Sequence, residues 1–497
     1  MIDSSFARMA VFFLCTFLNQ ATIAQEKPIA HLDHYFNTLS RNNQFNGNVL
    51  VAEGGKIIYE RSFGYADFSA QKPNTKNTSF LIASITKTFT STAILQLQER
   101  GKLNINDPLV KYFAAFPYPS ITLRQLLSHT SYLPASGFYA FLDSLQKTTD
   151  TIFTNYDVIP ALIALKKPLL GFPKGDRSDF SYSNLNYYLL ALLIEKLSGM
   201  PYNSYIKKNI FIPAGMEHSS LAEFYVGIDP ALCKEHKYQF IFSTMPQRID
   251  TMEENLRFFQ TYNLKGHGDI ISTVGDLLKY DQALYTGKLL KQSSLDLAFH
   301  AVVPGIPGDS GYGLGWSIGN DSTNGKEIHH HGGGIGIQAM LVRNITKHQT
   351  IILFDNTKNY AFDMAMNALD ILNGKTPPVF KPSVAKAYGK MIVNQGIPAA
   401  RKLLEKLKKD MVHYSLTEDE MNVLAYQLMR NNMDEKATEV FKTNLELFPG
   451  SWNSYDSYGE ILLKTGKKEE AIKMYRRSME LNPNNDNGKK VLEKLLK

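Results

Sequence analysis

Three short groups of residues contain side chains that could carry out nucleophilic catalysis. In Ser84-Ile85-Thr86-Lys87, a hydroxyl and an amine are three positions apart. On a helix this spacing places them on one face, one turn apart, where the amine can activate the hydroxyl. Tyr182-Ser183-Asn184 and the glycine-rich stretch His329-His330-His331-Gly332-Gly333-Gly334 follow in that order. Together the three groups predict a serine hydrolase.

The position of Ser84 in the chain distinguishes it from other serines that precede a lysine by three residues. Roughly three such pairs are expected by chance in a chain of this length. Ser84 follows the apolar stretch 80–83 and begins a stretch with helical periodicity that should end at Gly101. A helix N-terminus can polarise the serine and supply a backbone N–H group. The other pairs are Ser144-Lys147, Ser204-Lys207 and Ser383-Lys386.

The surrounding pattern predicts strands at both ends of a domain and helices between them. Residues 49–52 and 56–59 flank Gly54-Gly55, as the strands of a hairpin would. Helical periodicity covers 186–197 and 273–284, the second with Ser272 or Thr273 as its cap. Further strands are expected at 313–318, 336–342 and 350–354. This order favours an α+β domain whose sheet is completed by the two ends of the domain.

After Thr376-Pro377-Pro378 the pattern becomes entirely helical and contains a repeat. The pairs with a spacing of 34 residues are Ala437 and Ala471, Phe441 and Tyr475, Pro449 and Pro483, and Ala425 and Gly459. The period of 34 residues and the residue types at these positions resemble those of the tetratricopeptide repeat. Two clear repeats are fewer than the three usually needed, so 382–409 should form a degenerate helical pair and 491–497 a capping helix.

The length of the chain indicates several domains, and its N-terminal residues indicate an exported protein. With 497 residues and 44% apolar residues, the chain is too long for a single core. We expect a signal peptide at 1–24, a hydrolase domain at 25–375 and a helical repeat domain at 376–497. Arg8, the apolar run 9–18 and the small residues before Gln25 fit a secretory signal, with an uncleaved anchor as the alternative.

Cysteine usage and charge narrow the location and the partners. Without Cys15 in the signal, the mature chain retains only Cys233 and no internal disulfide, which favours the bacterial periplasm or the cell exterior. The net charge of +7 is modest, and the C-terminal lysines alternate with Glu at helical spacing. We therefore expect no nucleic-acid partner and no stable membrane span in the mature chain.

The chain resembles the serine β-lactamase-related hydrolases of the class C type, with their D-peptidase and esterase relatives. Besides the three motifs, the resemblance includes segments 101–103, 107–108, 126–131, 215–216, 272–277 and 311–316, and it covers about Gly47 to Asn356. It implies a β-lactamase/transpeptidase-like fold, with an antiparallel sheet, flanking helices and a helical lobe. It also implies catalysis without a cofactor or metal.

The resemblance implies a role for each motif residue. Ser84 would attack a carbonyl to form an acyl-enzyme while Lys87 and Tyr182 shuttle its proton, and Asn184 would orient the substrate amide or the Lys87 amine. The oxyanion hole would combine the backbone N–H groups of Ser84 and Gly333. For Lys87 or Tyr182 to act as a base near neutral pH, its pKa must fall by about three units.

The third motif departs from the β-lactamase pattern, because histidine replaces the lysine of lysine-threonine-glycine. A histidine is mostly uncharged at neutral pH, so the grip on a substrate carboxylate is weaker. An ester, an amide or a D-amino-acid peptide is therefore a more plausible substrate than a β-lactam. Either His330 or His331 could take the lysine position, and strand alternation places these two side chains on opposite faces.

Other interpretations of these residues are less favourable. Adjacent histidines on a strand cannot all converge on one metal ion. The stretch Gly308-Asp309-Ser310-Gly311 imitates the nucleophile segment of trypsin-like proteases, but no matching disulfide framework accompanies it. His129 is expected to be structural. Tyr132 stands where the family pattern usually has glycine, which leaves the conformation of that loop open.

We expect an enzyme whose helical repeats bind a protein partner or pack on the catalytic face. The alternative is a catalytically silent protein that senses cell-wall peptides or penicillins, or a scaffold that acts through its repeats. The presence of Ser84, Lys87, Tyr182 and Asn184 together argues for the enzyme.

Overall fold

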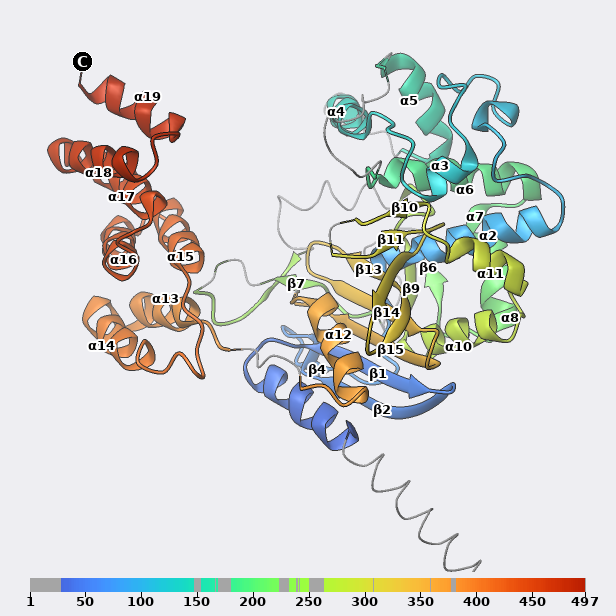
Figure 1. Ribbon diagram of the computed structural model, residues 1–497, viewed down its shortest axis with the longest axis horizontal. Helices are drawn as coiled ribbons and strands as arrows, with labels where there is room; N and C mark the ends of the chain where they lie inside the picture. The colour runs from blue at the N-terminus through green and yellow to red at the C-terminus, as the bar shows by residue number, and fades with distance from the viewer. Residues whose placement is uncertain are drawn as a thin grey trace, which may run out of the picture. The chain divides into compact units, whose positions relative to one another are not determined.

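The structure, a computed structural model, describes residues 28–146, 153–165, 167–168, 180–222, 232–237, 240, 242–249, 263–306, 308–357, 359–376 and 381–496. The signal sequence expected at 1–24 lies outside these residues. The chain forms two compact units, one made of 1–237 and 248–378, the other of 238–247 and 379–497 (Figure 1). We refer to them as the α/β unit and the helical unit.

An eight-stranded antiparallel sheet forms the centre of the α/β unit. The first strand pairs with the last, so the two ends of the domain complete the sheet, as the sequence predicted. The strand order is β10 (Val303–Pro304), β11 (Gly311–Tyr312), β12 (Ser317–Asp321), β13 (Gly325–Gly333), β14 (Gln338–Asn344), β15 (Gln349–Asp355), β1 (Gly47–Glu53) and β2 (Lys56–Phe63).

Shorter elements complete this unit. The small sheets are β5 (Phe80–Leu81), β9 (Ile270–Ser272) and β6 (Ser220–Leu221); β3 (Tyr65–Asp67) and β4 (Lys72–Pro73); and β7 (His236–Lys237) and β8 (Gln247–Arg248). The described helices are one over 28–41, then η1 (Ala83–Ile85), α2 (Thr86–Glu99), η2 (Leu109–Lys111), α3 (Leu123–Leu127), α4 (Ala135–Gln146), η3 (Asn155–Asp157), α5 (Val158–Leu165), α6 (Asn184–Ser198), α7 (Tyr202–Ile206), η4 (Lys207–Phe211), α8 (Ile212–Ala214), α10 (Val274–Tyr285), α11 (Gln292–Ala298) and α12 (Ala361–Leu372).

Both faces of the central strands are covered. Every residue of β15 is buried, which requires packing on each side. Leu50, Ile352 and Leu341 lie opposite one another on β1, β15 and β14 and belong to the core that includes α2 and α6. Helix α12 packs on β14 and β15 (Figure 1). The sheet is therefore a layer between helices.

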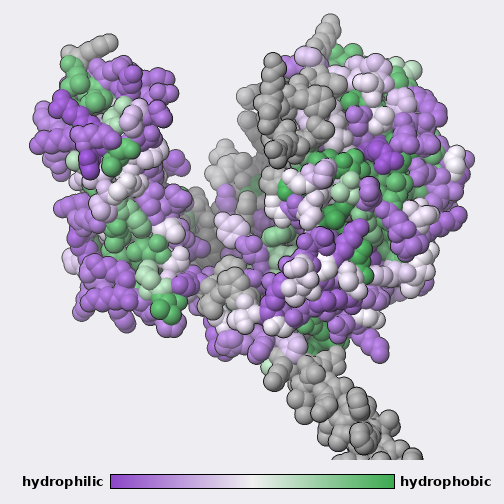
Figure 2. All heavy atoms as spheres, in the orientation of Figure 1, coloured by the Kyte–Doolittle hydropathy of each residue, from purple (hydrophilic) through white to green (hydrophobic). Residues whose placement is uncertain are grey.

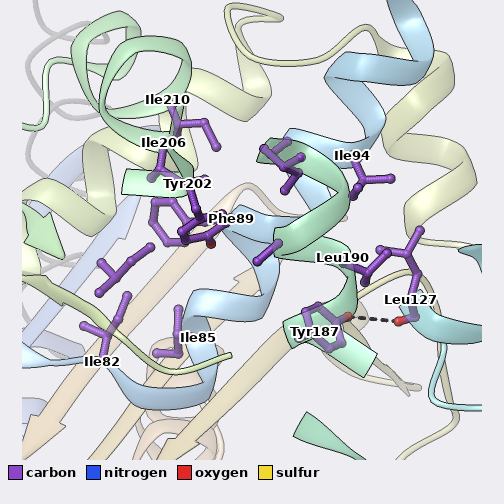
Figure 3. Close-up of a cluster of buried hydrophobic side chains, with 14 of the residues drawn as sticks. Ile82, Ile85, Phe89, Ile94, Leu127, Tyr187, Leu190, Tyr202, Ile206 and Ile210 are labelled. Carbon is purple, nitrogen blue, oxygen red and sulfur yellow. Dashed lines mark hydrogen bonds between the residues drawn. The ribbon is translucent and has the colours of Figure 1, made fainter. Parts of the chain in front are cut away.

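Helices α2 and α6 run through the core of this unit. All residues of α2 from Thr86 to Leu97 are buried, and so are those of α6 from Leu185 to Ile194. A helix that is buried on all sides lies inside a protein, and its threonines must find partners there. The Thr92 hydroxyl, for example, donates to the Thr88 carbonyl at 2.9 Å. Figure 3 shows apolar side chains around Phe89 and the Tyr187 hydroxyl bonded to the Leu127 carbonyl.

Two sequence predictions need correction or refinement. The strand expected at 313–318 is wrong over its first four residues, because β12 begins only at Ser317. Gly315 has φ +81°, and a Cβ there would lie 2.8 Å from the Cβ of Ser91 on α2. Close approach to that helix therefore imposes a turn. Of the two candidate caps of α10, Thr273 is the one observed, and its side chain accepts a hydrogen bond from the Asp276 N–H.

The helical unit consists of three helix pairs and a final helix. Within the segment where a degenerate pair was expected, α13 packs against α14. The last helix begins at Asp486, five residues earlier than the sequence suggested. The helices are α13 (Val384–Gln395), α14 (Ile397–Leu407), α15 (Glu418–Arg430), α16 (Asp434–Leu447), α17 (Trp452–Lys464), α18 (Lys468–Leu481) and α19 (Asp486–Leu495).

The N-caps of this unit reveal a regular period. The side chains of Ser383, Thr417, Ser451 and Asn485 each accept a hydrogen bond from the backbone three residues later. A side-chain oxygen at this position satisfies an N–H group that the helix leaves free. Successive caps are 34 residues apart, so the first helix of every pair and α19 start in one register. The repeat therefore begins at α13.

Aromatic side chains from segment 238–247, between β7 and β8, complete the core of the helical unit. Phe242 is buried among Val384, Tyr388 and Leu424. A Cβ on Gly389 of α13 would lie 3.1 Å from the Cβ of Phe242. The ring of Phe240 stacks on that of Phe242, with centroids 5.0 Å apart. The first repeat therefore depends on residues that are distant in sequence.

The face shown in Figure 2 is largely polar. On each unit hydrophilic residues predominate, and smaller groups of hydrophobic residues are visible among them. No helix within the described ranges is long and apolar enough to cross a bilayer.

Replacing Phe242 by alanine should destabilise the first repeat. Loss of a buried aromatic ring costs about 3 kcal/mol. Amide hydrogen exchange in α13 and α15 should accelerate accordingly, as measured by mass spectrometry of peptides from these helices. Met245→Ala, at a position 59% exposed in the same segment, is the control. Equal exchange in the two variants would contradict the role of Phe242.

Candidate active site

Ser84 lies in the one-turn helix η1, which leads directly into α2. The preceding residue, Ala83, has φ +44°, a conformation that is uncommon for a residue with a side chain. The carbonyl of Ile270 on β9 accepts a hydrogen bond from the Ile82 N–H at 2.9 Å and so anchors the start of this turn. The serine is therefore held on a strained, supported turn rather than on a flexible loop.

Lys87 follows Ser84 by one turn, and its amine is directed at the serine. Its Nζ donates to Ser84 Oγ at 2.9 Å and to the His267 carbonyl at 2.8 Å. The side chain is completely buried. Burial lowers the pKa of Lys87 well below its usual value, although the charge of Asp269 partly opposes this change. A neutral amine beside a serine hydroxyl can accept its proton.

Tyr182 approaches the same serine from the segment before α6. Its phenol is hydrogen-bonded to Ser84, and the Lys87 Nζ lies 4.9 Å from the centre of its ring. The side chain is 46% exposed, but the hydroxyl end is shielded, and this burial raises the pKa of Tyr182. Burial thus favours the neutral phenol of Tyr182 and the neutral amine of Lys87.

His129 contacts the segment that contains Tyr182. Its Nδ1 accepts a hydrogen bond from the Ser183 N–H at 3.1 Å, and its ring centre lies 4.2 Å from that of Tyr182. Burial lowers the pKa of His129. At Tyr132, where the conformation was left open, φ is +52°, so the backbone adopts the left-handed conformation that glycine would favour.

Asn184 is the first residue of α6, close to these groups in the chain. The sequence suggested that it orients either the substrate or the Lys87 amine. Among the described residues, the hydrogen bonds of Lys87 go to Ser84 and to His267, whereas Asn184 is bonded to Tyr139 of α4. Its Oδ1 has no hydrogen-bond partner among the described atoms. This oxygen is itself buried.

The three histidines of β13 occupy different environments. His330 is buried, its ring centre is 6.5 Å from that of Tyr182, and its Nε2 is 3.2 Å from the Tyr312 hydroxyl. His331 is exposed and bonded to Gln338, while His329 Nε2 lies 2.8 Å from Asp309 Oδ1. His330 is therefore the histidine that faces the Ser84 site. This geometry favours the register in which it takes the lysine position, followed by His331 and Gly332.

The end of β13 lies against the turn that carries Ser84. A Cβ on Gly332 would be only 2.1 Å from the Ile82 carbonyl oxygen, so only glycine fits there. Gly333, the expected second oxyanion donor, is the next residue and the last of the strand. The close approach at Gly332 thus brings the end of β13 beside the backbone of Ser84.

The site contains no fixed positive charge among its described side chains. Burial lowers the pKa of His330 well below its ordinary value, and a proton on Lys87 would lower it further. Although His331 is exposed as a residue, desolvation of its ring by the surrounding protein also lowers its pKa. Within the described residues, no three His, Cys, Asp or Glu side chains are arranged to hold a metal ion. Burial therefore favours the neutral forms of Lys87, His330 and His331 at this site.

Two contributors to this site were missed from the sequence. His267 acts through its carbonyl oxygen, which every residue type possesses, so no sequence signal marks it. Tyr139 belongs to none of the three sequence motifs, so the sequence did not mark it as part of the site. The trypsin-like segment has a different role, since Asp309 binds His329.

Both units of the chain match known protein families. A family model described as Beta-lactamase matches residues 32–374, and one described as Tetratricopeptide repeat matches 453–485. Penicillin-binding protein 4* of Bacillus subtilis is 35% identical over 331 residues, which is 66% of this chain and 71% of that protein.

Two solved structures are also similar to the chain. A penicillin-binding protein from Bacillus halodurans matches with a TM-score of 0.57 and 26% identity, covering 68% of this chain and 99% of that one. An octameric penicillin-binding protein homologue from Pyrococcus abyssi gives a TM-score of 0.59 and 27% identity, covering 70% and 78%. The family match includes Ser84, Lys87, Tyr182 and all of β13.

Substituting alanine at Gly332 should abolish reaction at Ser84. The new methyl group would displace either β13 or the turn at Ile82, which separates the serine from the glycine strand. We expect at least a hundredfold slower acylation, measured with an activated ester. Gly275→Ala on α10 is the control, because a Cβ there meets nothing closer than 3.9 Å. Normal acylation of the Gly332 variant would refute the close approach.

The buried histidines should make the protein less stable in acid. Burial lowers the pKa of His267 to about 3, against about 6.5 in an unfolded chain. Its contribution to stability is therefore complete above pH 6.5 and is lost as the pH falls towards 3. Between pH 7 and pH 5 the loss is about 2 kcal/mol.

Urea denaturation of the wild type and of His267→Asn at these two pH values measures this contribution. The variant should show the smaller decrease in stability between pH 7 and pH 5. His34→Gln, at an exposed position in the N-terminal helix, is the matched control. An identical decrease in wild type and His267→Asn would contradict the assignment.

Proposed function

The chain belongs to the β-lactamase family, and we propose that it is an exported serine hydrolase that works through an acyl-enzyme at Ser84. The substrate would be an ester, an amide or a peptide that contains a D-amino acid. The observation that carries this proposal is the 2.9 Å hydrogen bond from a fully buried Lys87 to Ser84 Oγ.

In the first step, the neutral Lys87 amine removes the proton from Ser84 as Oγ attacks the substrate carbonyl carbon. A free lysine is charged at neutral pH and could not accept this proton. Burial removes that obstacle, since it favours the neutral amine. The negative charge that develops on the carbonyl oxygen would be stabilised by the N–H groups of Ser84 and Gly333, each worth about a hundred- to a thousandfold in rate.

In the second step, the leaving group departs with a proton. Tyr182 is bonded to Ser84 and held as a neutral phenol, so it can donate its own proton while it receives the one on Lys87. A water molecule then attacks the acyl carbon by the reverse sequence and releases Ser84. Asn184, the first residue of α6, would orient the substrate amide.

The neutral histidines of the site support this choice of substrates. A negatively charged substrate group is usually held by a lysine or arginine. Here burial favours the neutral form of His330, and His331 points away from Tyr182 to Gln338. We therefore expect the enzyme to accept acyl donors without a carboxylate beside the reacting bond and to hydrolyse β-lactams poorly.

The other parts of the proposal concern location and partners. Residues 1–24 have the pattern of a signal peptide, which would place the enzyme in the periplasm or outside the cell. The tetratricopeptide match at 453–485 supports a protein partner for the helical unit.

Intact-mass spectrometry tests the proposal directly. The mature protein would be exposed to a fluorophosphonate probe and, separately, to a penicillin. We expect one adduct with the fluorophosphonate, none in Ser84→Ala, and slower or weaker labelling by penicillin. Tyr182→Phe should retain its fold but label about a hundredfold or more slowly, because it lacks the phenolic proton.

The opposite outcomes point to other functions. Labelling that persists in Ser84→Ala would contradict Ser84 as the nucleophile. Stable penicillin labelling without turnover of any ester would favour the sensor. A folded protein that reacts with neither probe would favour a scaffold that acts through its repeats.

A further inference from the structure

Helix α2 holds the segment 264–270 with three side chains. The Thr90 hydroxyl donates to the Gly266 carbonyl at 2.7 Å, and the Lys87 amine donates to the His267 carbonyl at 2.8 Å. The Thr86 hydroxyl accepts from the Ile270 N–H at 3.1 Å. This segment therefore lies along the same helix that carries the catalytic lysine.

Asp269 lies inside this segment and is fully buried. Its Oδ1 accepts a hydrogen bond from the Gly266 N–H at 2.8 Å, which closes the turn around the His267 carbonyl. Gly266 itself packs against α6, because a Cβ there would lie 2.7 Å from the Cβ of Ala191. The carboxylate thus fixes the bend of the backbone that accepts the hydrogen bond from Lys87.

The second carboxylate oxygen, Oδ2, has no hydrogen-bond partner among the described atoms. A buried carboxylate with an unsatisfied oxygen is costly unless another group compensates it. Burial raises the pKa of the Asp269 carboxyl, and Lys265 and the backbone N–H groups of the segment oppose that rise. A purely structural turn could use asparagine at this position without the cost of a buried charge.

The groups around Lys87 show which charge Asp269 compensates. Among the described residues, those that act on or face the amine are Tyr182 and Tyr187, His129, His330 of β13, and His267 and Asp269 of the segment. Asp269 is the carboxylate in this set, and its charge favours the protonated lysine. The histidines and tyrosines are neutral there, because burial disfavours their charged forms.

We propose that Asp269 is a positioning residue that holds the His267 carbonyl on Lys87 and supplies the negative charge that the protonated lysine requires. The inference rests on the proposed function. When Lys87 takes the proton of Ser84, a cation forms in a buried site, and the net charge of the pair Lys87 and Asp269 changes from minus one to zero. The proton returns through Tyr182 to the leaving group, and Asp269 itself exchanges no proton.

The test compares Asp269→Asn with Asp269→Ala through the pH dependence of acylation. Asparagine keeps an oxygen for the Gly266 N–H but lacks the charge, whereas alanine lacks both. The rate of reaction with an activated ester would be measured between pH 4 and pH 10. The acidic limb of this profile reports the protonation of Lys87 in the free enzyme.

Removing the charge should lower the pKa of Lys87, since Asp269 normally raises it. In Asp269→Asn we therefore expect the acidic limb to move to lower pH by about one unit. The plateau should fall about tenfold, because a weaker base accepts the proton less readily. Asp269→Ala should show the same shift and a larger loss of rate. Asp276→Asn, a buried carboxylate of α10 bonded to Lys279, should keep the wild-type limb.

The outcomes separate this inference from the function on which it rests. A wild-type adduct at Ser84 together with an unshifted limb in Asp269→Asn would overturn the role of Asp269 alone. A lower plateau with an unshifted limb would reduce Asp269 to a structural residue. Absence of a Ser84-dependent adduct in the wild type would overturn both.

Discussion

The burial of the Lys87 amine is the constraint on which the rest of the site depends. A lysine surrounded by protein favours its neutral form, and only that form can accept a proton. To keep water away, α2 must be covered on every side, by α6, by the segment 264–270 and by the apolar cluster around Phe89 (Figure 3). The long buried helices thus favour the neutral form of Lys87 as well as stabilising the fold.

The sequence was sufficient to indicate residues that lie next to one another in the structure. The order and spacing of Ser84, Lys87 and Tyr182 indicated groups that the structure does bring together. Choosing between His330 and His331 was impossible without a structure, because alternation shows that two neighbours face opposite ways but not which face is the active one. The short distance between the rings of His330 and Tyr182, and the hydrogen bond of His331 to Gln338, supply that information.

Periodicity predicted much of the fold and failed where local backbone geometry dominated. The helices near 186–197 and 273–284 and the paired end strands are confirmed. The turn at Gly315 was missed, since its cause is contact with a helix more than two hundred residues away in the chain. The first repeat of the helical unit is recognisable in the sequence from its capping residues more clearly than from its core residues. Ser383 and Thr417 carry the same capping chemistry as Ser451 and Asn485, at one constant interval.

The contribution of Phe242 to the helical unit affects the order in which the protein can fold. Helical repeats normally assemble from neighbours in sequence, which makes their folding fast and local. Phe242 instead waits for helices synthesised roughly 150 residues later, about 10 to 30 s at ordinary rates of translation. During that interval Phe240 and Phe242 are without the helices that cover them in the folded protein. The helical unit therefore cannot complete its core until its own helices have been synthesised, although part of that core is made long before them.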